Sequence, residues 1–170
     1  MTIPKKIKTQ ELVFMAALIA INVILSRFLS ISAWNLKIGF SFVPVVIAAL
    51  YLGTWQAGVV GGLGDLIGAV FFPIGRYFPG FTFVAVLTGL AYGLFLHKKQ
   101  TFARIFCVVF LTELIGSVIM NSFWISLLYG SPYLAIVLPR LIQAGVMLVV
   151  ECVVIRLLIN YVPAIQQKTS

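Results

Sequence analysis

Charged and polar side chains inside apolar runs are the residues of this chain that could do chemistry. Asp65 lies in the apolar stretch 58–72, and Arg76 and Tyr77 follow it in a short loop beyond Pro73. Ionisable groups at membrane depth are costly, so they usually face a cavity or a partner rather than lipid. A buried carboxylate beneath a cationic, aromatic loop therefore predicts a binding site for a small solute.

Two later stretches could add polar groups to this site. Glu113, Ser117 and Asn121 follow one another at intervals of four residues, so they share one face of an α-helix. Arg140 and Gln143 are three residues apart and share a face of the last apolar run. With the carboxylate above, these side chains would supply hydrogen-bonding groups of both charge signs at a similar depth.

Aromatic residues could form flat apolar walls around these polar groups. A pocket with aromatic walls and a few polar groups suits a heteroaromatic ligand. Any single aromatic residue could instead be an anchor at the membrane interface. The candidates for the walls are Phe40, Phe42, Tyr77, Phe78, Phe81 and Trp124.

The composition indicates which elements must hold these residues. Of the 170 residues, 62% are hydrophobic and 9% are charged, and the mean hydropathy is +1.13. A helix needs about 20 apolar residues to cross the hydrocarbon layer of a membrane. The sequence therefore predicts an all-α, polytopic membrane protein, a compact bundle of six transmembrane helices in a single domain over residues 1–170. The expected spans are 11–29, 42–52, 56–72, 81–96, 102–127 and 133–161.

Basic residues give the expected orientation of the bundle. Cytoplasmic loops carry an excess of Lys and Arg, so both the N and the C terminus are expected in the cytoplasm. The same bias accounts for the formal net charge of +8, and no nucleic-acid partner is expected. The basic residues on the expected inner side are Lys5, Lys6, Lys8, Lys98, Lys99, Arg104 and Lys168.

A smaller set of basic residues departs from this rule, because it falls on the outer side or in the outer half of the membrane. Two explanations are open. These cations could form ion pairs inside the bundle with Asp65 or Glu113, or Arg27 and Lys37 could simply reach the interface with their long side chains. Alternatively, they could line an outward-open pocket that attracts an anion. The set is Arg27, Lys37, Arg76 and Arg140.

The sequence does not support a catalytic, cofactor or metal site. There is no P-loop, so the chain cannot by itself couple ATP to transport by that chemistry. The single histidine, His97, comes without a GxSxG nucleophile motif. Cys107 and Cys152 have neither a CxxC motif nor a metal-ligand partner. We therefore expect no enzymatic activity, no cofactor and no metal.

Several long strings of residues resemble those of a known family. They are RFLSI at 27–31, NLKIGFSFVP at 35–44, GDLIGAVFFPIGRYFPGFT at 64–82 and LPR at 138–140. Over most of its length the chain resembles the substrate-binding S components of energy-coupling factor (ECF) transporters, and among them the folate-specific FolT type.

This resemblance implies a multi-pass subunit of the bacterial cell membrane, surrounded by membrane lipid, that binds folate or a similar vitamin from outside. It would deliver the vitamin by associating with a transmembrane coupling subunit and a pair of ATP-binding subunits. Ala16 and Ala20 resemble the surface with which such components dock on the coupling subunit. The matching positions imply binding roles for Arg27, Lys37, Asp65, Arg76, Tyr77, Asn121, Trp124 and Arg140, and the pocket argument adds Phe40, Phe81 and Gln143.

Two other functions stay open. The chain could be an S component for another vitamin, and an uncharged ligand would make the outer cations superfluous. It could also be a membrane scaffold protein that assembles partner complexes without transporting a solute. A scaffold predicts no solute pocket, so the presence or absence of a pocket separates these alternatives.

Overall fold

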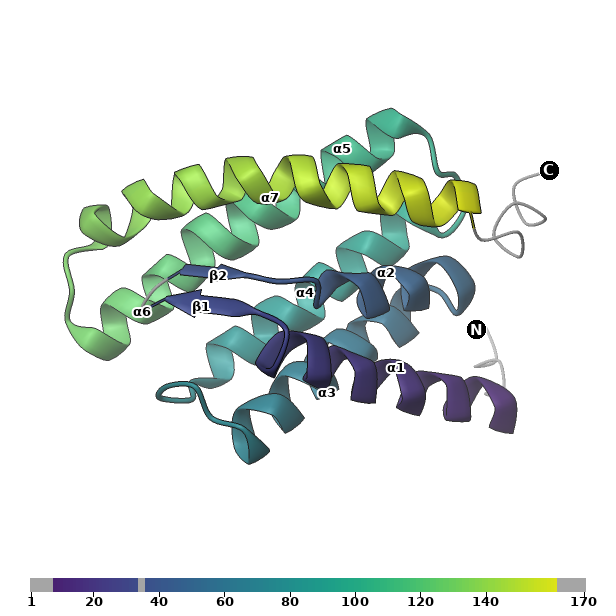
Figure 1. Cartoon of the computed structure of the whole chain (residues 1–170), viewed down its shortest axis with the longest axis horizontal. Coiled ribbons are helices and arrows are strands. Elements are labelled where there is room, and N and C mark those ends of the chain that lie inside the picture. Colours follow the sequence, from purple (N-terminus) through teal and green to yellow (C-terminus); the bar gives the residue numbers. More distant parts are fainter. Residues whose placement is uncertain (1–7, 34–35, 162–170) are drawn as a thin grey trace, which may run out of the picture.

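The computed structural model of the chain describes residues 8–33 and 36–161, with side chains described for 8–30 and 39–160. Within these residues the backbone forms six helical rods and one short hairpin (Figure 1). The all-helical bundle of six helices expected from the sequence is confirmed. The rods are α1 (Thr9–Arg27), α2 (Phe42–Tyr51), α3 (Thr54–Phe71), α4 (Pro79–Leu96), a continuous rod of α5 (Phe102–Leu111), η1 (Thr112–Met120) and α6 (Asn121–Tyr129), and α7 (Tyr133–Tyr161).

Four of the rods are long and apolar enough to cross a membrane, judged by length and composition over the described residues. They are α1, α4, the α5–η1–α6 rod and α7. Helix α2 is apolar but has only ten residues. Helix α3 is not among the four, because five glycines and Asp65 lower its mean hydropathy. The glycines are Gly58, Gly61, Gly62, Gly64 and Gly68.

Two segments differ from the regular elements expected from the sequence. The stretch expected as a loop between the first two helices contains an antiparallel hairpin of β1 (Ile31–Ala33) and β2 (Leu36–Ile38), with Ile31 opposite Ile38. Strand pairing satisfies backbone groups that an irregular loop would leave to water. The expected fifth helix contains the π-helix η1, and π-helical segments are rare and frequently lie at functional sites.

Helices α3 and α4 pack with their backbones in direct contact. A Cβ atom on Gly61 would lie 2.7 Å from the carbonyl oxygen of Ala85, and one on Gly89 would clash with the backbone of Ala57. Small residues at such positions allow transmembrane helices to approach closely. This contact fixes the position of Asp65, which lies one turn beyond Gly61 on the same helix.

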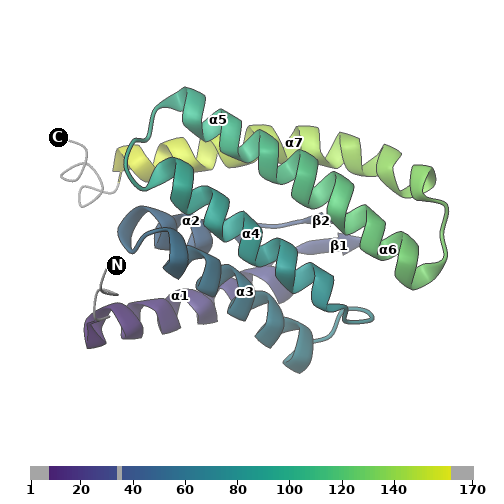
Figure 2. The same cartoon turned by 180° about the vertical axis from the view of Figure 1, so that it is seen from behind.

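The bundle has two different ends. In Figures 1 and 2 the first turn of α1, the last turn of α7 and the junction between α4 and α5 lie at one end, which we call the terminal end. The most deeply buried apolar side chains include Leu50, Leu96, Ile105 and Ile155, each at most 1% exposed, and they belong to the core toward this end. The helix ends at the terminal end carry the basic residues Lys8, Lys98, Lys99, Arg104 and Arg156. The positive-inside rule predicts that this end faces the cytoplasm.

Candidate functional site

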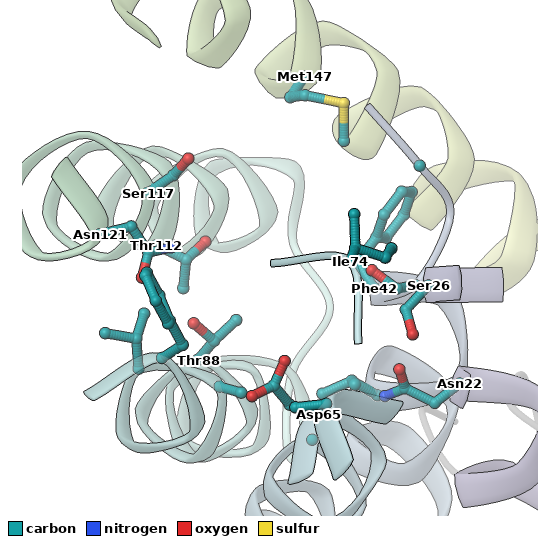
Figure 3. A pocket seen from close by; sticks show the side chains of 18 of the residues that line it. Asn22, Ser26, Phe42, Asp65, Ile74, Thr88, Thr112, Ser117, Asn121 and Met147 are labelled. Carbon is teal, nitrogen blue, oxygen red and sulfur yellow. The ribbon is translucent and has the colours of Figure 1, made fainter. Parts of the chain in front are cut away.

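A cavity of about 700 Å³ occupies the part of the bundle away from the terminal end. Every helical rod contributes to its lining, and the loop 73–77 borders it. Figure 3 shows side chains from both sides of the bundle around one hollow, with Asn22 and Asp65 facing Ser117 and Asn121 across it, and Met147 above. Ligand pockets typically have volumes of about 300–1,000 Å³. The cavity is therefore large enough to enclose a small molecule.

Asp65 holds three elements together at one wall of the cavity. Its Oδ1 atom lies 3.7 Å from Nη2 of Arg27, whose side chain is only 10% exposed. The hydroxyl of Thr82 donates a hydrogen bond of 2.9 Å to Oδ2 of Asp65, and it lies 3.2 Å from the hydroxyl of Tyr77. The ion pair that the sequence left open is thus present between Arg27 and Asp65. Both carboxylate oxygens of Asp65 are engaged by protein groups.

Glycine makes the contact between α1 and this part of α3 possible. A Cβ atom on Gly68 would lie 2.6 Å from Nε of Arg27, and one on Gly64 would lie 2.8 Å from the side chain of Asn22. Because these positions carry no side chain, the guanidinium of Arg27 can lie across α3 and reach Asp65. The small residues of α3 therefore position the charged pair as well as packing the helices.

The polar face predicted for the fifth span lies on the opposite wall. Glu113, Ser117 and Asn121 all line the cavity, and Nη1 of Arg140 donates a hydrogen bond of 2.7 Å to the backbone oxygen of Ser117. Gln143 lines the cavity beside Arg140. The buried side-chain atoms of this wall that lack a hydrogen-bond partner among the described residues include Oε2 of Glu113, Oδ1 of Asn121 and Nε of Arg140. Buried polar groups of this kind are costly unless a ligand or water satisfies them.

The deep part of the cavity contains a pair that the sequence reasoning missed. The hydroxyl of Tyr92 on α4 donates a short hydrogen bond to Oε2 of Glu151 on α7, and both side chains are buried and line the cavity. Glu151 is the one acidic residue among the 29 residues of α7, and a carboxyl group in so apolar a sequence could have indicated a polar site. Further cavity residues outside the predicted set include Asn22, Ser26, Thr88 and Thr112.

The remaining predicted binding residues fall into two groups. Arg76, Tyr77 and Phe81 line the cavity, with Arg76 and Tyr77 in the exposed loop that borders it. Phe40 is 46% exposed and packs against Phe42, which itself lines the cavity. Trp124 packs against Phe78, with ring centroids 5.1 Å apart, and is not a lining residue. The structure brings neither Phe40 nor Trp124 to the cavity wall, and the side chain of Lys37 lies outside the described residues.

Trp124 does not line the cavity because its side chain packs against the first turn of α4 instead. A Cβ atom on Gly80 would lie 2.6 Å from the indole ring of Trp124, so the ring rests directly on the first turn of α4. Glu113, Ser117 and Asn121 therefore line the cavity without Trp124.

The predicted docking residues lie on a different surface. Ala16 and Ala20 are both exposed on α1, whereas Leu18 and Asn22 of the same helix are buried. Their neighbours Val13 and Ile24 are 65% and 49% exposed. This surface of α1 is apolar, flat at the alanines and separate from the cavity lining.

Comparisons with known proteins agree on one family. The family model described as "ECF transporter, substrate-specific component" matches residues 10–159. A relative named folate transporter FolT from Clostridium novyi is 33% identical over 149 residues, which are 87% of this chain and 87% of that protein. Another folate transporter FolT, from Leuconostoc mesenteroides, is 31% identical over 162 residues, 91% of this chain and 87% of the relative. The crystal structure of FolT bound with folic acid has a TM-score of 0.86 and 33% identity, covering 91% of this chain and 95% of that one.

Proposed function

Because the chain belongs to the family of substrate-specific components of ECF transporters, we propose that it is the membrane subunit that captures folate from outside the cell. The family consists of transport components, so the chain is a substrate-binding subunit of a bacterial transporter and a multi-pass protein of the cell membrane, and it is not an enzyme. The identity of the vitamin, the binding residues and the partner proteins are the proposed parts.

The observation that carries this proposal is the cavity of about 700 Å³ with charged groups of both signs. Folate has a flat pterin ring with donors and acceptors on its edge, and a glutamate tail with two carboxylates. The cationic side chains could meet the tail, and Glu113 could accept hydrogen bonds from the pterin edge through an oxygen that has no protein partner. Phe42, Tyr77 and Phe81 supply aromatic surface for the ring.

Simple magnitudes support tight binding by such a site. A hydrogen bond to a charged group contributes about 1.5–3 kcal/mol when it is well made. Each factor of ten in affinity corresponds to about 1.4 kcal/mol, so a few such bonds in a preorganised cavity are sufficient. Asp65 is a weaker candidate for the pterin edge than Glu113, since both of its oxygens already have protein partners.

Delivery of folate would need partners. We propose that α1 docks on a transmembrane coupling subunit through its exposed surface around Ala16 and Ala20, and that a pair of ATP-binding subunits drives release. Small residues allow close approach between helices in a membrane, which suits a contact with a partner helix. A membrane scaffold would need such a surface too, but it would not need a polar cavity.

Equilibrium binding with the purified protein tests the proposal. Isothermal titration should detect folate and should not detect riboflavin, thiamin or pantothenate. Arg76→Ala removes an exposed cation that lines the cavity, and it should weaken folate binding by about tenfold, the value of one charge-assisted bond. The matched control is Arg156→Ala, because Arg156 is an exposed arginine on α7 outside the lining and its loss should change nothing.

Two results would overturn the proposal. Affinity for a different vitamin together with none for folate would replace folate as the substrate. Equal affinities of the Arg76→Ala variant and the wild type for folate, with a folded variant, would remove Arg76 from the site and favour a ligand without an anionic tail. Thermal unfolding of each variant shows whether the fold is intact.

A further inference from the structure

A second, smaller hollow lies outside the cavity, on the surface of the bundle. It has a volume of about 350 Å³ and is lined by Leu94, Phe95, Ala103, Arg104 and Cys107, none of which lines the cavity. The first two residues belong to the last turn of α4 and the other three to the first two turns of α5. We call this hollow the α4–α5 groove. Figure 2 shows the junction of these two helices at the terminal end of the bundle.

The walls of the groove are held in place from within. The opposite side of α5 carries Ile105 and Val108, both fully buried in the apolar core. The side-chain amide of Gln100 donates a hydrogen bond of 3.2 Å to the backbone oxygen of Leu96, which ties the connecting turn to the end of α4. Nδ1 of His97 lies 3.1 Å from the backbone oxygen of Ala49, so this ring faces α2. The groove is therefore a preformed feature, and a ligand would lose little energy in ordering it.

The charge around the groove has one sign. Arg104 is part of the lining, and Lys98 and Lys99 are exposed in the turn between the two helices. The chain has four acidic residues in all, and none of them lies between Asp65 and Glu113. Asp65, Glu113 and Glu151 line the cavity, and Glu11 lies in the first turn of α1. The groove thus combines apolar walls with cations that have no acidic neighbour on α4 or α5.

The position of the groove in the membrane indicates which class of ligand it could bind. The terminal end is the cytoplasmic end, so Arg104 and the two lysines lie where the headgroups of the inner leaflet are expected. Basic pockets between transmembrane helices on that side bind anionic headgroups, and the inner leaflet is negatively charged. The apolar side chains continue from this level into the membrane, with Leu94 67% exposed. A molecule that fits both parts has a phosphate at one end and a hydrocarbon chain at the other.

We propose that the α4–α5 groove binds an anionic phospholipid of the inner leaflet. The phosphate lies at Arg104, with Lys98 and Lys99 beside it. One acyl chain lies against Leu94 and Phe95. This site is independent of the vitamin cavity, so it holds whichever solute the cavity takes.

Native mass spectrometry of the delipidated full chain in detergent tests the site, with phosphatidylglycerol as the probe and phosphatidylcholine of the same acyl chains as the zwitterionic comparison. The wild type should bind phosphatidylglycerol more tightly. Removal of one cation near an anionic headgroup weakens binding by about fivefold, so Arg104→Gln should lose about that factor for phosphatidylglycerol and little for phosphatidylcholine. Cys107→Trp should reduce binding of both lipids, because Cys107 is exposed and the larger ring would fill the groove without changing the charge.

The control and the opposing results follow from the same geometry. Arg156→Gln removes an exposed arginine of α7 outside the groove and should leave phosphatidylglycerol binding unchanged. Equal binding of the two lipids by the wild type would overturn the proposal. An Arg156→Gln effect as large as that of Arg104→Gln would also overturn it, since the attraction would then be a property of the whole basic end. Should Cys107→Trp fail to fold by thermal unfolding, Ala103→Leu fills the same groove, and unchanged binding in that variant would count against the site.

Discussion

Replacement of Asp65 by asparagine separates two roles that this carboxylate could have. In the structure Oδ1 lies 3.7 Å from Nη2 of Arg27, and Oδ2 accepts a hydrogen bond of 2.9 Å from Thr82. An asparagine can still accept the bond from Thr82, but it no longer neutralises Arg27. We predict that Asp65→Asn lowers the stability of the protein and has a smaller effect on folate binding.

The size of the stability loss follows from the burial of the pair. Breaking a fully buried ion pair costs about 3–5 kcal/mol, and exposed pairs contribute about 0.2–1 kcal/mol. The side chains of Arg27 and Asp65 are 10% and 26% exposed, and their contact is long, so an intermediate loss of about 1–3 kcal/mol is expected. For a chain of 170 residues each kcal/mol corresponds to about 2–4 °C, and the predicted fall in Tm is about 2–12 °C.

Thermal unfolding and isothermal titration on the same preparation show whether Asp65 acts on stability or on ligand binding. The Kd for folate should rise by no more than about tenfold, since Asp65 acts by holding Arg27 and, through Thr82, Tyr77. Glu11→Gln is the control, because Glu11 forms no ion pair among the described residues and its replacement should change neither quantity. An unchanged Tm with a loss of affinity of more than about a hundredfold would show that Asp65 contacts the ligand directly, and the positioning role would be wrong.

Three other substitutions test separate parts of the structure. Ala16→Trp or Ala20→Trp adds bulk to the exposed surface of α1 and should abolish folate uptake by cells while binding to the purified protein is retained; loss of binding would show that this surface packs internally. Tyr92→Phe removes the hydroxyl that donates to the buried carboxyl group of Glu151, and it should lower the free energy of unfolding by about 1–3 kcal/mol. Denaturant titration measures this quantity, and an unchanged value would contradict the reasoning. Gly89→Val would force the backbones of α3 and α4 apart and should give aggregated protein in size-exclusion chromatography, and a normal monodisperse peak would refute the close contact.

The helical framework could be predicted because its signals are local. The last helix was expected at residues 133–161 and is found at Tyr133–Tyr161, since a polar turn precedes it and a long, predominantly apolar run follows. The fourth begins at Pro79, where proline suits the first turn of a helix, two residues before the expected start. The hairpin was not expected, because strand pairing depends on contact between two segments that each look like loop.

Side-chain placement in the site was harder to predict, and the reasons differ between residues. The π-helical hydrogen bonding of η1 leaves no mark in the spacing of Glu113, Ser117 and Asn121, which suits either kind of helix over this length. The side chain of Trp124 packs on Gly80, and the sequence pattern around Trp124 does not show this contact, because the two residues are far apart in the chain. Glu151 could have been found, because an acidic residue within an apolar run is by itself a signal. Its hydrogen bond with Tyr92 could not have been predicted, because no pattern in the sequence pairs the two helices.

The distribution of acidic residues links the fold to the proposed capture of an anion. Three of the four acidic side chains of the chain line the cavity, and the cavity also contains Arg27, Arg76 and Arg140. Arg27 is paired with Asp65, and Arg140 is held by the backbone oxygen of Ser117, whereas Arg76 is exposed in the loop that borders the cavity. A carboxylate arriving from solution would meet Arg76 before the partly buried pair. Because the apolar core fills the terminal end, the charged groups can lie in a hollow at the other end without weakening the packing that holds the helices together.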